Sequence, residues 1–442
     1  MLAFAGSRLA LLVAFALLAG GAAGAQTRPP DTGDLTVPDA FNMRLVGHAD
    51  LTLLGEGMAE KLASGGRRIF YVAHESGAQC FAVLDVTDAA HPQVLSEIPS
   101  PGKDLRCNSL DLNGNTLVVA AESGNQGEPG GGIRVYDVSQ PASPRLVSYF
   151  DTTGPRSRGV HHVWLSNEAT AHITTGASDF TPKRNTGDDQ FYMIVDLHDR
   201  EHPKEVGRWW YPGQRNTDAG SVNPIPAPPQ SIGTEVYRPH NIDVFPNHPN
   251  RAYMGYLDGG LVIVDIADPA HPKPVSITRY GSPGFTHTAF PIFSRNLLAL
   301  SEEALGDHCA EGAKRITLWD ISDEKHPVFL SVMPYAANTA QLCARDGRYG
   351  AHNIYENKPY GPTWKSDTTI VGSFFGGGVR VFDIRDPRNP KEAAYYVPAA
   401  PAGSEKHEVQ INDVYVDDRG LIFGCDRFTG GLYILSSDAV KP

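Results

Sequence analysis

Short apolar runs that alternate with polar residues dominate the chain, and they predict strands rather than helices. One pattern recurs about every 50 to 70 residues: an apolar strand ending in Asp, a polar turn that usually closes on Pro, and a second strand. The Asp stands at Asp85, Asp137, Asp196, Asp265, Asp320 and Asp383, and a seventh copy has Ser436 at this position. Repeats of this length are typical of the blades of a β-propeller.

Each repeat holds four short runs with strand-forming composition. The fourth repeat shows them most clearly, at residues 241–245, 251–256, 260–265 and 274–278. Gly, Asn, Asp and Pro fill the turns, and no amphipathic stretch of about ten residues predicts a helix. The pattern therefore predicts blades of four antiparallel strands.

The last repeat lacks a fourth strand, because the chain ends soon after its third one. Residues 43–47, near the N-terminus, resemble the outer strands of other repeats, such as residues 205–209. We expect this segment to complete the last blade and close the ring, which removes an exposed sheet edge. The predicted fold is all-β: a seven-bladed β-propeller of four-stranded blades over residues 42–442.

The first 25 residues have the pattern of a secretory signal peptide. Arg8 supplies the positive charge, an apolar run follows it, and cleavage is expected near Ala25. Residues 26–41 are then an N-terminal linker. No later segment is apolar for the ~18 residues that span a membrane. We expect a periplasmic or secreted protein, monomeric and without a membrane span in its mature chain.

Residues 261–265 read Leu-Val-Ile-Val-Asp, and the chain resembles the LVIVD-repeat family through this segment. The Asp at the corresponding position of five further repeats extends the resemblance over nearly the whole mature chain, with Ser436 as the departure. The resemblance implies an exported β-propeller of bacterial cell envelopes. It implies an architecture but no chemistry.

The net charge limits the classes of partner that we expect, and the cysteine content bears on whether disulfides form. The formal charge of −12 and the absence of a basic block exclude nucleic acid as an expected partner. Five cysteines in an exported chain permit disulfides, although their spacing does not determine the pairing. Our interpretation is two structural bridges, Cys80 to Cys107 and Cys309 to Cys343, with Cys425 left over.

The longest loops are predicted to lie on one face of the propeller, at residues 122–132, 177–189, 211–237, 302–313, 334–349 and 397–406. The opposite face receives mostly short turns, including His-Pro turns at His91, His202, His271 and His326. Long loops on a rigid scaffold often carry function, so the long-loop face is the expected functional face, although they could be merely tolerated insertions. Aromatic residues clustered there, such as Phe180, Tyr237 and Phe285, would favour ligand binding.

Histidines recur where the first strand of each repeat begins. The aligned residues are Asn108, His162, His240, His287, His352 and Asn412, and the first repeat is too irregular to align. These polar residues could cap the strands, or the four histidines could bind a transition metal such as Fe, Cu or Zn. Glu122, Glu302 and Glu303 are the candidates to orient the rings, while His74 and His161 are less well placed as ligands.

Three functions remain open at this stage. The favoured one is a binding module whose long-loop face takes an envelope protein, a glycan or a small molecule. The alternative is a metal-dependent enzyme, redox or hydrolytic, and the third is a structural or anchoring component. The chain has no phosphate-binding loop and no nucleophile elbow, and no residue stands out as a catalytic acid, base or nucleophile.

Overall fold

The computed structural model describes residues 36–222, 235–280, 284–312, 314–334, 339–404 and 406–442. The expected signal peptide and most of the expected linker lie outside these residues. In the described part of the chain, helical structure is limited to α1 (Thr339–Cys343) and three single 3-10 turns. None of these described helices is long and apolar enough to cross a membrane.

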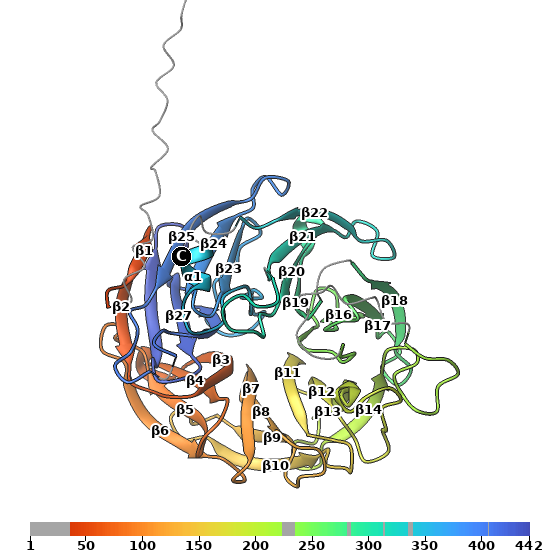
Figure 1. The fold of residues 1–442 in the computed structure, drawn as a ribbon. Coiled ribbons are helices and arrows are strands. Elements are labelled where there is room, and N and C mark those ends of the chain that lie inside the picture. The colour runs from red at the N-terminus through yellow and green to blue at the C-terminus, as the bar shows by residue number, and fades with distance from the viewer. Residues whose placement is uncertain (1–35, 223–234, 281–283, 313, 335–338, 405) are drawn as a thin grey trace, which may run out of the picture.

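Antiparallel sheets are arranged radially around a common centre, with the strands of each sheet following one another outward (Figure 1). Three sheets contain four consecutive strands each. They are β11 (Val160–Asn167), β12 (Thr170–Thr175), β13 (Phe191–Asp196) and β14 (Lys204–Trp209); β15 (Ile242–Asp243), β16 (Arg251–Gly255), β17 (Leu261–Asp265) and β18 (Lys273–Thr278); and β19 (Thr286–Ile292), β20 (Leu297–Glu302), β21 (Ile316–Asp320) and β22 (Val328–Val332). The strands predicted for the fourth repeat coincide with β15 to β18 within a few residues.

The first two repeats join into one sheet. It contains β3 (Leu54–Leu62), β4 (Arg68–His74), β5 (Gln79–Asp85), β6 (Gln93–Pro99), β7 (Leu105–Asn113), β8 (Thr116–Ser123), β9 (Gly132–Asp137) and β10 (Arg145–Asp151). A single pairing between His74 and Cys107 links the two repeats. Cys107 also forms a disulfide with Cys80.

The second expected disulfide, between Cys309 and Cys343, is also present. It ties the 302–313 loop to α1 on the long-loop face. Cys425 is buried and has no disulfide partner. Both expected bridges therefore form. The first joins strands β5 and β7 of the first two repeats, and the second joins a loop to α1.

The N-terminal strands pair with the last two sheets. Strand β2 (Met43–Ala49) pairs with β28 (Leu432–Ser437), which follows β26 (Ile411–Val416) and β27 (Leu421–Asp426). Strand β1 (Asp39–Phe41) pairs with β25 (Lys391–Val397), beyond β23 (Thr369–Ser373) and β24 (Val379–Asp383). Strand structure thus begins inside the segment expected to be a linker, where Phe41 packs on Tyr395.

The recurring Asp of the repeats closes the turn that follows its strand. In all six explicit copies, its Oδ1 accepts a hydrogen bond of 2.8–2.9 Å from the backbone N–H two residues later. This is the Asx-turn geometry that Asp favours. A second Asp in the same turn binds the Nδ1 atom of the His-Pro histidine at 2.8–2.9 Å; the pairs are Asp88 with His91, Asp199 with His202, Asp268 with His271, and Asp323 with His326.

The core lies between neighbouring sheets, where apolar residues of alternate strand positions meet. Phe70 of the first repeat stacks on Phe423 of the last one, with ring centroids 4.4 Å apart. Phe180 and Tyr237 are buried, in contact with Phe191 and Tyr211. These two aromatic residues of the long loops thus serve packing and do not form an exposed ligand-binding platform.

Candidate metal centre

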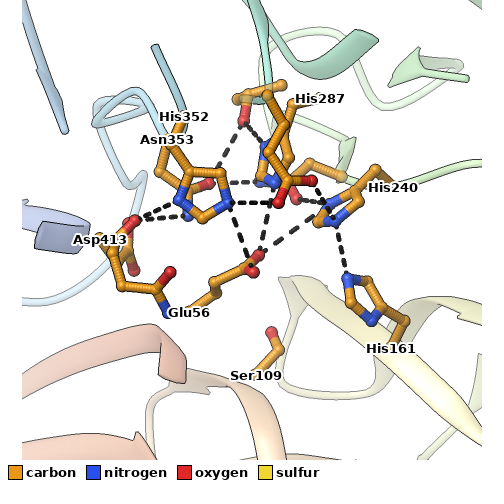
Figure 2. A network of polar contacts seen from close by, with 12 residues as sticks. Glu56, Ser109, His161, His240, His287, His352, Asn353 and Asp413 are labelled. Atoms are coloured by element: carbon orange, nitrogen blue, oxygen red, sulfur yellow. Dashed lines mark hydrogen bonds and ion pairs between the residues drawn. The ribbon is translucent and has the colours of Figure 1, made fainter. Parts of the chain in front are cut away.

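Four histidines meet at the centre of the ring, where the innermost strands begin (Figure 2). His161 belongs to β11 and His287 to β19, while His240 and His352 precede β15 and β23. The Nε2 atoms of His161 and His240 are 2.7 Å apart. Ring centroids are 3.6 Å apart for His240 and His287, and 4.4 Å apart for His287 and His352. All four side chains are buried.

His161, not the expected His162, joins the other three histidines. A β-bulge between Val160 and His162 breaks the two-residue alternation of β11. His162 is buried as well, but its Nδ1 atom finds no hydrogen-bond partner in the part of the chain that the structure describes. Burial and the nearby Lys358 ammonium lower the pKa of His162 well below its usual range. The alignment therefore found the right level of the channel and missed the register by one residue.

Glu56 of β3 lies among the histidines, and the sequence did not reveal it because the first repeat could not be aligned. Its carboxylate oxygens lie 3.5 Å from His287 Nε2 and 3.5 Å from His352 Nε2, and the side chain is 8% exposed. Glycine flanks it on both sides. A Cβ atom at Gly55 or Gly57 would lie 2.6 Å or less from the backbone of β7. The Gly-Glu-Gly sequence was the available signal, since glycine marks a close approach of two backbones.

Glu303 is the second carboxylate of the cluster. It lies 3.8 Å from His352 Nε2 and 4.0 Å from His240 Nε2. It was expected to orient a histidine from outside, yet its distances suit a ligand as well. Glu56, His161 and His240 form one group of three possible metal ligands; Glu56, His287 and His352 form another; and His240, His287 and Glu303 form a third. The donor atoms within each group lie within 4.8 Å of one another.

Each histidine of the cluster is held through its Nδ1 atom. The partners are Glu122 Oε1 for His161 at 2.7 Å, Asn241 Oδ1 for His240 at 2.9 Å, Thr288 Oγ1 for His287 at 2.9 Å and the Asn412 carbonyl for His352 at 2.6 Å. A carboxylate and a carbonyl can only accept, so they fix the proton on Nδ1. The lone pair of Nε2 then faces the centre. Rings around protein-bound metals are commonly oriented in this way.

Glu122 fulfils the expected orienting role, although for His161. Its carboxylate is buried and also accepts from Arg106 and from Gln190 Nε2 at 3.1 Å. Burial would raise the pKa of Glu122, but Arg106 and His161 hold it well below its usual range. Glu302 and His74 lie apart from the cluster. Glu302 Oε2 accepts from the backbone N–H of Arg315, and His74 Nε2 lies 3.6 Å from Glu97.

Charge and protonation in the cluster fit a cation at its centre. Burial lowers the pKa of His240 and of His287, which favours the neutral, ligating form of both rings, whereas the Glu56 and Glu303 carboxylates outweigh burial and raise the pKa of His352. Burial would raise the pKa of Glu56, but His352 and His240 hold it well below its usual range. Among the described residues, the Nε2 atoms of His287 and His352 have no hydrogen-bond partner. A buried polar atom without a partner costs about 1–3 kcal/mol, and a metal ion would satisfy both atoms.

Comparison with known families places the chain by its repeats. The model of the LVIVD repeat matches residues 129–152, which contain β9 and β10, and residues 250–278, which contain β16 to β18. The chain therefore contains LVIVD repeats. This confirms the resemblance drawn from residues 261–265. No curated protein matches the chain.

Among solved structures, this LVIVD-repeat protein is similar to the β-propeller domain of Cps50 (Swd1) from Myceliophteria thermophila. The two are 13% identical, with a TM-score of 0.51, over 90% of this chain and 98% of that one. At this identity the similarity shows the fold alone, and the fold is a β-propeller.

Below the histidines, the channel of the LVIVD-repeat protein carries amides and then acids. Asn241 Nδ2 donates to Asn353 Oδ1 at 3.3 Å and to Glu356 Oε1 at 3.2 Å. Burial and Glu356 raise the pKa of Asp413 to about 8. Lys358 lies 3.5 Å from Asp111 Oδ1. This lower layer therefore holds a lysine ammonium among its acids.

Proposed function

We propose that this LVIVD-repeat protein holds one transition-metal ion at the centre of its propeller, bound by the Nε2 atoms of His161, His240, His287 and His352. One observation carries the proposal: the four buried rings are fixed through Nδ1, and together with Glu56 and Glu303 they form three overlapping groups of possible metal ligands. Neutral imidazole suits Fe, Cu and Zn. Glu56 and Glu303 are close enough to add an oxygen ligand or to balance the charge of the ion.

We also propose that the ring has seven blades and is closed by its N-terminal strand. The pairing of β2 with β28 supports the closure, and the bridge between Ile354 and Gly372 supports an inner strand beside β23. A closed ring would explain how Glu56, from the first repeat, is kept beside His352, from the sixth. The proposed metal centre thus depends on the circular arrangement.

Such a centre would serve a metal-dependent enzyme of redox or hydrolytic type. An ion held by neutral imidazoles keeps its positive charge and has coordination positions for substrate or water, so it can polarise a bound oxygen or, as Fe or Cu, exchange an electron. Glu56 and Glu303, both with lowered pKa values, are ionised at neutral pH and could accept a proton. Burial acts against ionisation in both, and the neighbouring histidines outweigh it.

A binding role for the long-loop face is the second candidate. A pocket of about 390 Å³ on this face favours a small molecule as the ligand. Its lining includes Leu53, Arg106, Arg348 and Arg427. The burial of Phe180 and Tyr237 gives no support to an aromatic glycan platform. The two disulfides agree with the proposed export to the periplasm or beyond.

Elemental mass spectrometry of the untagged mature protein, produced in a periplasm, tests the metal centre. We expect about one equivalent of Fe, Cu or Zn in the wild-type protein, and less than about a tenth of that in the His240→Ala, His352→Ala double variant. The matched control, His202→Ala with His271→Ala, should keep its metal. Metal-free wild-type protein that takes up none of these ions when they are supplied would contradict the proposal.

A further inference from the structure

The pocket above the histidines is bordered by more cations than anions. Its charged wall consists of Arg106, Arg348, Lys406 and Arg427 against Glu75 and Asp307, in a chain whose formal charge is −12. Leu53, Leu305 and Phe428 form an apolar border. A volume of about 390 Å³ lies at the lower end of the range for small-molecule sites.

Two of these arginines connect the pocket to the metal centre. Arg106 donates to Glu122, which holds His161. Arg348 Nη1 donates to Glu303 Oε1 at 3.0 Å, and the same oxygen lies 3.8 Å from His352 Nε2. The pocket is therefore joined to the histidine layer through these two arginines, each of which bonds a carboxylate that contacts a cluster histidine.

The guanidinium groups are held in place but keep free donors. The groups of Arg348 and Arg427 lie 5.4 Å and 5.7 Å from the ring centre of Phe375, which stacks on His352. Within the described residues, the Arg427 guanidinium donates only through Nη2, to Glu75, and that of Arg348 only through Nη1. Each group thus has further N–H donors for a ligand, and such planar forks fit carboxylate and phosphate oxygens.

A further guanidinium at the same end of the channel has no carboxylate partner. Arg238 lies two residues before His240 and donates through Nη1 to the side-chain oxygen of Gln190, which in turn donates to Glu122. No ion pair joins Arg238 to any acid in the described part of the chain, and its buried Nε atom has no acceptor there. This guanidinium is therefore held by an amide two residues before a proposed ligand, and the Asp189 and Glu122 carboxylates act on its charge without a direct ion pair.

From these contacts we propose that the mouth of the channel binds a small oxyanion, a carboxylate or a phosphate, beside the metal ion. The inference rests on the proposed metal centre and names the class of its substrate or ligand. Arg427 and Arg348 would bind the anionic group from one side, and Arg238 would supply charge from the other. Lys406, which pairs with Asp307, closes the outer border. The apolar border leaves room for a short carbon chain.

Isothermal titration calorimetry with succinate and with inorganic phosphate tests the proposal on metal-loaded and chelator-treated protein. Each is compared in the wild type, Arg427→Gln and Lys406→Gln. The matched control is Arg385→Gln, an exposed arginine that pairs with its own turn at Asp383. We expect at least about tenfold weaker binding in Arg427→Gln, a smaller loss in Lys406→Gln and no change in the control. The metal content and melting temperature of every variant are measured alongside.

The outcomes separate this proposal from the metal centre. Stronger binding of succinate identifies the ligand as a carboxylate, and stronger binding of phosphate identifies a phosphate ester. Anion binding that needs Arg427 in protein unable to hold a metal would support the oxyanion site and contradict the metal centre. Metal-loaded protein that binds neither probe, or binds both equally well after Arg427→Gln, would overturn the oxyanion site.

Discussion

Histidines recur in two regions of this molecule, and only one of the two sets converges. The His-Pro histidines each bind an Asp three residues earlier in the same turn, and their side chains are 71–79% exposed. The channel histidines are buried, and each is held through Nδ1, which leaves its Nε2 atom for the shared cluster. Both sets repeat with the blades. Repetition alone thus reflects the architecture, whereas burial together with convergence indicates a site.

The largest difference in metal affinity between the two regions is expected when a direct metal ligand is replaced. Replacing His287 by Ala should lower the affinity for the metal at least about a hundredfold, because it removes a ligand from a closed and rigid set. Replacing His271 by Ala should leave affinity unchanged, since that ring bonds only within its turn. Competition with a chromophoric chelator measures both. If the two variants bound the metal with equal affinity, the distinction between channel histidines and His-Pro histidines would be wrong.

Two neighbouring histidines of β11, His161 and His162, test which of them belongs to the channel histidines. His161→Asn should weaken metal binding by about tenfold or more, while His162→Asn should not, because only His161 Nε2 faces the other rings. The same chelator competition applies. A stronger effect at His162 would show that the strand register, and with it the four-histidine set, is wrong.

A smaller effect is expected from the residue that orients His161. Glu122→Gln keeps the shape of the side chain but loses the charge, so metal affinity should fall about tenfold. Glu97→Gln is the matched control, because Glu97 lies beside His74, outside the cluster. Titration of the metal into both proteins gives the two constants. Unchanged affinity in Glu122→Gln would indicate that the Glu122 contact does not support a metal ligand.

The smallest effect concerns pH and the lower layer of the channel. With its pKa raised to about 8, folded Asp413 keeps a proton that the unfolded chain loses near pH 4. Stability should therefore fall as pH rises from about 4 to about 8, and Asp413→Asn should reduce this fall and raise the melting temperature at pH 8 by about 1–3 °C. Thermal melts at several pH values measure it, with the exposed Asp199→Asn as control. A steeper fall in Asp413→Asn would contradict the assignment.

The sequence predicted the repeats because their signals are local. The Asp that closes each turn, the alternation of the strands and the outer strand at residues 43–47 can all be recognised in short segments. The two disulfides were also anticipated. Strand β1 was missed, since three residues carry too little pattern to be distinguished from a linker.

The site could be predicted only in part, because it depends on contacts between distant strands. His240, His287 and His352 were found by aligning the repeats. The bulge that turns His161 inward depends on the pairing of β11 with β12, which composition does not reveal. Glu56 lies in the repeat that could not be aligned, and Glu303 was assigned to a supporting role because its distance to His352 is a tertiary property.

Anomalous diffraction from crystals of the metal-loaded protein, recorded at the absorption edge of the metal found by elemental analysis, tests the central claim most directly. We expect one peak inside the channel, about 2 Å from the Nε2 atoms of at least three of His161, His240, His287 and His352. A peak at the exposed His-Pro turns, or no peak in the channel of protein shown to contain the metal, would contradict the claim.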